Sequence, residues 1–217
     1  MKTANFSKMN ILLCIFISLS LWIVFDLNIQ KKINFRQFDP VVVGKLDADM
    51  WRSYYERKRF KLFWQMSKLV REQFHAPFWR SFPMAYRAAK AAFVFKEGHN
   101  RDDYAKAFPF LENYYADINA LSDKPFDTKT MTQQELEWWI IRREKEHTTA
   151  EWEQILAETA AILYHEPRGK FKDYAHLRVE AMFFRDQKGD NITEADWQHV
   201  NDLCIQSWQA VQMALQN

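Results

Sequence analysis

Several places in this sequence combine a carboxylate with a histidine three positions later. Three of these pairs are Glu144 with His147, Asp173 with His176, and Asp196 with His199. On a helix this spacing puts both side chains on one face, which is how ferritin-like di-metal bundles present their ligands. A metal-dependent helical enzyme is therefore one hypothesis for this chain, although three pairs are only a mild excess over chance.

The best of these groups is Asp173, His176 and Glu180, whose side chains share one side of a helix. The opposite side is apolar, so we expect the group to face solvent. Glu144 and His147 lie in the polar run RREKEH, which is unlike a bundle interior. A di-metal centre also needs inward carboxylates from two other helices. These five residues stay candidate ligands, but we expect surface polar networks and no cofactor.

Several other chemistries are excluded by residue spacing. The four glycines, at 44, 98, 169 and 189, are too far apart to build a phosphate-binding loop, and no serine lies between glycines as a nucleophile elbow requires. Cys204 follows His199 by five positions, which on a helix points the two side chains about 140° apart. The remaining cysteine, Cys14, lies near the other end of the chain, so no disulfide framework is expected. The sequence thus favours a protein that is not an enzyme.

The most informative segment is the apolar run Ile11–Phe25, which carries no charge. Its fifteen residues span about 22 Å as a helix, short of the roughly 30 Å of a bilayer core, so Leu27 and Ile29 must extend it. We predict a single-pass membrane anchor with a short leader over residues 1–30. A linker is expected over 31–39.

A cleaved signal peptide is the alternative, because Ser18 and Ser20 are small residues with the spacing of a cleavage site. The apolar run continues past them, which favours a retained anchor. The orientation stays open. Lys2 and Lys8 precede the run, whereas four basic residues follow it within the next twenty positions.

Residues 40–217 predict one compact all-α domain of about seven helices, because apolar residues recur three and four apart and no window alternates as a strand does. Helix starts are predicted where a capping residue precedes the pattern. The expected helices run from Pro40 to about Phe74, from 82 to 97, from Asn100 to about Ser122 with a kink at Pro109, from Thr132, from Thr148, from after Pro167 to about 186, and from Thr193.

Charge is unevenly divided along the chain. Residues 51–101 hold twelve Lys plus Arg against three acids, a balance of +9, and residues 102–217 hold twelve against twenty-one, a balance of −9. One interpretation is that the basic part packs on the acidic part or that each is a solvated face. The other is that basic and aromatic residues near the anchor contact an anionic membrane surface.

The residues predicted to contact lipid are Arg57, Lys58, Arg59, Lys61 and Trp64. Nucleic acid could use the same composition, but a membrane tether makes that partner unlikely. We therefore expect an interaction or scaffold module at a membrane surface, with lipid headgroups or another membrane protein as partner.

Trp138 and Trp139 are neighbours on a predicted helix, so their side chains point about 100° apart. Both cannot face the same core, and we expect one of them at the surface or at a contact.

Overall fold

The computed structural model describes residues 8–29, 31–144 and 146–216; the predicted leader, with Lys2, lies outside them. The all-α prediction is confirmed, and nine helices follow the N-terminal one in the described residues. The helices are α1 (Lys8–Asn28), α2 (Pro40–Tyr55), α3 (Arg59–Phe74), α4 (Ser81–Glu97), α5 (Arg101–Ala105), α6 (Phe108–Leu121), α7 (Thr128–Ile141), α8 (Thr149–Tyr164), α9 (Lys172–Lys188) and α10 (Glu194–Gln216). Two short 3-10 helices, η1 (Arg168–Phe171) and η2 (Gly189–Asn191), flank α9.

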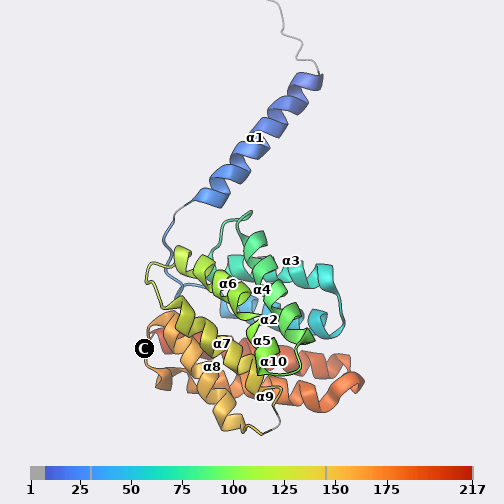
Figure 1. The fold of residues 1–217 in the computed structure, drawn as a ribbon, viewed down its shortest axis with the longest axis vertical. Coiled ribbons are helices and arrows are strands. Elements are labelled where there is room, and N and C mark those ends of the chain that lie inside the picture. The colour runs from blue at the N-terminus through green and yellow to red at the C-terminus, as the bar shows by residue number, and fades with distance from the viewer. Residues whose placement is uncertain (1–7, 30, 145, 217) are drawn as a thin grey trace, which may run out of the picture.

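The N-terminal helix α1 projects away from the other helices (Figure 1). Its 21 residues correspond to about 31 Å at the helical rise, which matches the thickness of a bilayer core. The segment Met9–Asn28 is long and apolar enough to cross a membrane by length and composition, and it is not buried against the domain. The helix includes Leu27, as expected, and ends just before Ile29.

The segment 31–39, expected as a linker, lies against the domain and contains a turn at Phe35 and Arg36. Ile33, Phe35 and Phe38 are buried in the main core. The amide of Ile33 donates to the carbonyl of Leu121 at 2.8 Å, and the amide of Asp123 donates to the carbonyl of Ile33 at 3.0 Å. Because these contacts bury three large side chains, the domain begins structurally near residue 31.

The prediction of one long helix from Pro40 to Phe74 is wrong in one respect, because the structure has two helices there, α2 and α3. Its predicted start is confirmed, because the Asp39 carboxylate accepts from the amides of Val41 and Val42. The break follows Tyr55, where Arg57 adopts a left-handed backbone with φ 58°. This turn lets α3 fold back and pack against α2. Neither glycine nor proline marks the turn in the sequence.

The helix predicted from Asn100 is likewise divided, into α5 and α6. Asn100 caps α5 as expected, through the amide of Asp103. Pro109 lies in the first turn of α6 rather than at a kink, because proline fits where no amide is needed. These two divisions account for the difference between seven expected and nine observed helices.

Two of the other predicted helix starts are confirmed and one is wrong. The Thr148 side chain and Glu151 form a capping box at the start of α8, and Thr193 and Asp196 exchange the same bonds before α10. The helix expected from Thr132 begins four residues earlier, at Thr128. Its cap is Asp127, whose carboxylate accepts from two amides.

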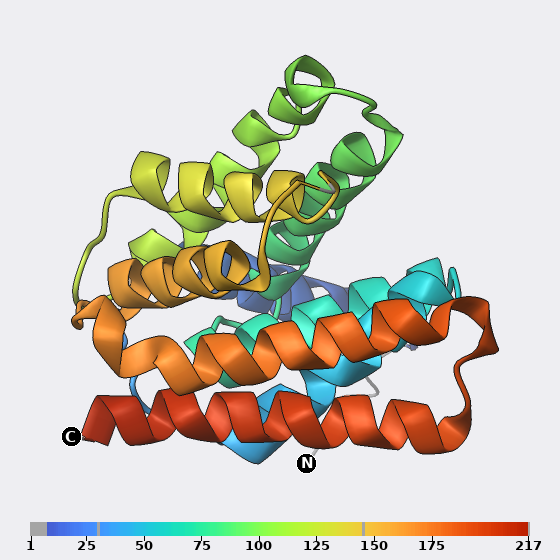
Figure 2. The ribbon, with the colours of Figure 1, turned by 90° about the horizontal axis from the view of Figure 1, so that it is seen from below.

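The long C-terminal helix α10 packs against both α2 and α9, and Figure 2 shows α9 and α10 side by side. The approach to α2 is closest at Gly44, where an added Cβ would lie 2.6 Å from the Cα of Ile205. The buried Asp47 of α2 then pairs with Arg178 of α9. Its carboxylate also accepts from the Trp208 indole of α10 at 3.0 Å.

Candidate functional site

The C-terminal end of α1 is joined to the loop between α3 and α4. Trp22 stacks on Phe78 with ring centroids 5.8 Å apart and meets Trp79 edge-on at 5.4 Å. One turn later, the Asp26 carboxylate accepts from the backbone amides of Trp79 at 2.6 Å and Arg80 at 3.3 Å. These bonds satisfy amides at the start of α4, so the position of α1 is tied to this loop.

Helix α3 lies on the side of the domain nearest α1 (Figure 1) and has two different sides. Its inner residues include the buried Val70 and Phe74. Its outer side carries exposed aromatic rings between lysines. This basic-aromatic face consists of Phe60, Lys61, Trp64 and Lys68, spaced three and four apart. Phe60 is 94% exposed and Trp64 55% exposed, which is unusual for large aromatic side chains.

The residues predicted to contact lipid gather at the start of this helix. Lys61 and Trp64 belong to the basic-aromatic face, whereas Arg57 and Lys58 lie in the turn before α3 and Arg59 is its first residue. Lys58 forms an ion pair with Glu56 at 2.7 Å. Across the described part of the chain, Arg57, Arg59 and Lys61 have no carboxylate partner. Their positive charge is therefore available to an anionic surface.

Other residues of the basic half do pair with the acidic half. Arg52 contacts Glu194, Arg87 contacts Asp117, and Arg101 contacts Glu137 and Glu144. The interpretation that the basic part packs on the acidic part therefore holds for these arginines. Several other cations of the basic half, among them Arg57, Arg59 and Lys61, have no carboxylate partner among the described residues.

Three of the five candidate metal ligands, Glu144, His147 and His176, take part in ion pairs near the surface. His147 lies 3.0 Å from Glu144 and 3.5 Å from Glu151, and the hydrogen bond with Glu144 raises the pKa of His147. Arg101 donates to both oxygens of the Glu144 carboxylate, at 2.9 and 2.7 Å, so a cation already binds this group. His176 meets Glu153 of α8 at 2.8 Å, and this bond raises the pKa of His176.

Asp173 and Glu180 lie on α9 with His176, as the spacing predicts. Asp173 and His176 line a shallow cleft between α8 and α9. In the described residues no group of three or more His, Cys, Asp or Glu side chains is placed to hold a metal ion. The structure therefore lends no support to a metal centre at these positions.

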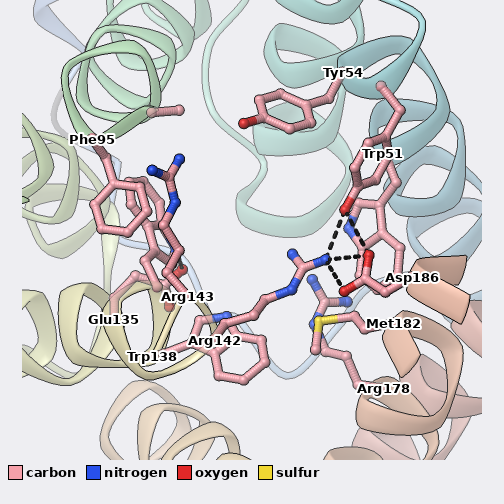
Figure 3. Close-up of a pocket in the computed structure, with 13 residues that line it drawn as sticks. Trp51, Tyr54, Phe95, Glu135, Trp138, Arg142, Arg143, Arg178, Met182 and Asp186 are labelled. Atoms are coloured by element: carbon pink, nitrogen blue, oxygen red, sulfur yellow. Dashed lines mark hydrogen bonds and ion pairs between the residues drawn. The ribbon is translucent and has the colours of Figure 1, made fainter. Parts of the chain in front are cut away.

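The chain also forms an open cavity of about 440 Å³ between α2, α4, α7 and α9. It is lined by six aromatic rings, three guanidinium groups and two carboxyl groups; these are Trp51, Tyr54, Tyr55, Phe95, Trp138, Trp139, Arg142, Arg143, Arg178, Glu135 and Asp186. Figure 3 shows most of them around the open space. A volume of this size is within the range of small-molecule sites in proteins.

The cavity contains a buried carboxyl group, Glu135 on α7. The Trp139 indole donates to it at 2.9 Å. Burial, which removes the carboxylate from water, raises the pKa of Glu135. The neutral carboxylic acid form of Glu135 is thus favoured more than that of a glutamate at the surface.

This cavity was not predicted from the sequence, although one local signal exists. Trp138 and Trp139 are followed four positions later by Arg142 and Arg143, a spacing that brings each aromatic ring beside a guanidinium on a helix. Trp138 is buried, Trp139 is partly buried, and both line the cavity. Trp139 is therefore the more exposed of the two, and its ring lies at this open cavity.

No family model, curated protein or solved structure matches this chain.

Proposed function

We propose that this chain is a single-pass membrane protein whose helical domain lies against the bilayer surface through α3 and acts there as an interaction or scaffold module. The observation that carries this proposal is the contact of Trp22 and Asp26 with the α3–α4 loop. If α1 crosses the bilayer, this contact holds α3 next to the headgroups.

The composition of the basic-aromatic face suits that position. Aromatic rings such as Trp64 are favoured at the depth of the headgroups. Basic residues near an anionic leaflet contribute about 1 kcal/mol each, and Arg57, Arg59 and Lys61 have no carboxylate partner among the described residues. A few such contacts would orient a domain that α1 already tethers.

The proposal is tested by measuring the depth of α3 in the full chain reconstituted into phosphatidylserine-containing nanodiscs. A nitroxide is attached to Phe60→Cys in a Cys14→Ser background; Cys204 is buried. The matched control is Phe183→Cys, because Phe183 is also exposed but lies on α9, at the end of the domain away from α1 (Figure 1).

We expect the label at position 60 to be relaxed by oxygen, which concentrates in lipid, and shielded from an aqueous nickel chelate. The label at position 183 should show the opposite. Replacing Arg59 and Lys61 by glutamate should move the label at 60 towards water. The proposal is wrong if the labels at 60 and 183 are equally accessible to the chelate in anionic nanodiscs.

A further inference from the structure

The charges of the cavity between α2, α4, α7 and α9 are not balanced. Arg142 forms an ion pair with Asp186 at 2.9 Å, and Arg178 pairs with Asp47. Arg143 is exposed at the cavity and has no carboxylate partner within the described residues, so it is the one guanidinium of the lining without an ion pair.

Arg143 is held only by weak contacts. Its guanidinium lies 4.6 Å from the ring centroid of Phe95 and 5.5 Å from that of Tyr104. Its hydrogen bonds go to the carbonyls of Lys96 and Gly98, both at 3.4 Å, which is near the limit for such a bond. An entering anion would therefore displace little.

The Tyr54 hydroxyl is a second hydrogen-bond donor at the same cavity. In Figure 3 the Tyr54 hydroxyl and the Arg143 guanidinium lie on different sides of the open space, with the Arg142 guanidinium below them. The carboxyl group of Glu135 lines the same cavity, but its partner there is the Trp139 indole at 2.9 Å and not Arg143. The polar part of the cavity is thus suited to one negative charge.

A second cavity, of about 230 Å³, adjoins the first and is mainly apolar. The two cavities share six lining residues: Trp51, Tyr54, Tyr55, Ala92, Trp139 and Arg142. Beyond this common wall the second cavity is lined by Met50, Leu62, Met66, Ala89 and Phe93. A charged compartment and an apolar compartment therefore meet between α2 and α4.

We propose that the two cavities together bind a single-chain amphiphile with one negative charge, of the fatty carboxylate class. The carboxylate lies beside Arg143 and the Tyr54 hydroxyl, and the chain enters the apolar compartment between Leu62 and Phe93. A monoanion fits better than a phosphate dianion, because Arg143 is the one guanidinium lining the cavity with no carboxylate partner among the described residues. This inference goes beyond the proposed membrane-surface function and does not depend on it.

The test titrates the full chain, in nanodiscs of neutral phosphatidylcholine, with octanoate by isothermal calorimetry and subtracts the heat of empty nanodiscs. Octanol and octylammonium are titrated in the same way, because they have the same chain with no charge or the opposite charge. We expect saturable binding of octanoate to one site. Octanol should bind at least about tenfold more weakly than octanoate, since it cannot form the charge-assisted hydrogen bond.

Two variants locate the site. Arg143→Gln removes the unpaired charge, and Ala92→Leu fills the wall shared by the two cavities; each should weaken octanoate binding about tenfold or more. Arg168→Gln is the matched control, because Arg168 is an exposed arginine outside both cavities. It should bind octanoate as the unmodified chain does.

Three results overturn the inference: no saturable octanoate binding, equal affinity for octanoate and octanol, or unchanged binding in a folded Ala92→Leu protein. The comparison of octanoate with octanol needs no variant, so it decides the question even if Arg143→Gln fails to fold. The titrations use neutral lipid and leave the α3 surface unmodified. Failure of the octanoate test therefore does not bear on the membrane-surface test, and the reverse also holds.

Discussion

The buried carboxylate of Asp47 should be among the most important single side chains for stability. It joins three helices, because it pairs with Arg178 of α9 and accepts from the Trp208 indole of α10. Asp47 itself is 3% exposed. Replacing Asp47 by alanine therefore leaves a guanidinium in the interior with no opposite charge beside it.

The size of the effect follows from that desolvation. Breaking a buried ion pair by removing one partner costs about 3–5 kcal/mol, because the remaining charge stays buried. In a domain of this size each kcal/mol lowers the melting temperature by roughly 2–4 °C. We expect Asp47→Ala to melt about 10 °C or more below the unmodified chain. The double variant Asp47→Ala/Arg178→Met should lose less than the sum of the two single variants, since no unpaired charge remains.

The assay is thermal unfolding of the full chain in detergent micelles, followed by circular dichroism. Glu158→Ala is the control, because Glu158 forms an exposed ion pair with Arg168 at 3.7 Å. That pair should contribute at most about 1 kcal/mol. If Asp47→Ala melts within a few degrees of this control, the interior ion pair is not desolvated as argued.

The other predictions use the same measurement or a titration. Gly44→Ala should lower stability by about 1–3 kcal/mol, because its Cβ would meet the backbone of α10 at 2.6 Å, whereas Gly169→Ala should be nearly neutral, since nothing lies within 4 Å of that position. Burial raises the pKa of Glu135 above its ordinary 4.5. The protonated side chain therefore stabilises the fold fully below pH 4.5, and this stabilisation is lost as the pH rises through the pKa of the folded state. Glu135→Gln should reduce this pH-dependent loss of stability in thermal melts at several pH values. The pKa of His147 is raised from 6.5 by Glu144, so its NMR titration should shift back towards 6.5 in Glu144→Gln, and an unchanged titration would refute the ion pair.

The helical architecture was predictable because its signals are local. Apolar spacing and the caps at Asp39, Thr148 and Thr193 are properties of short windows, and the structure confirms all three caps. The break after Tyr55 was not predictable in this way. Arg57 takes a left-handed conformation there with no glycine, and the return of α3 onto α2 is a tertiary contact.

The surface part of the site could be predicted and the interior part could not. Lys61 and Trp64 are neighbours in sequence, and a helix places them side by side whatever the tertiary fold. The cavity combines side chains from α2, α4, α7 and α9, so its shape depends on the packing of helices. The local sequence signal for the cavity is the spacing of four residues between the Trp138–Trp139 pair and the Arg142–Arg143 pair.

The two proposals meet in helix α3. Leu62 and Met66 line the apolar cavity, while Phe60 and Trp64 project from the other side of the same helix. A helix moves largely as a rigid body, so any shift of Leu62 and Met66 on ligand binding would also shift Phe60 and Trp64. If ligand binding changes the affinity of this face for lipid, lipid must change the affinity for the ligand by the same factor, because coupling between two binding sites is reciprocal. Couplings of this kind are typically about 1–3 kcal/mol, enough for an amphiphile in the cavity to alter how closely the domain contacts a bilayer.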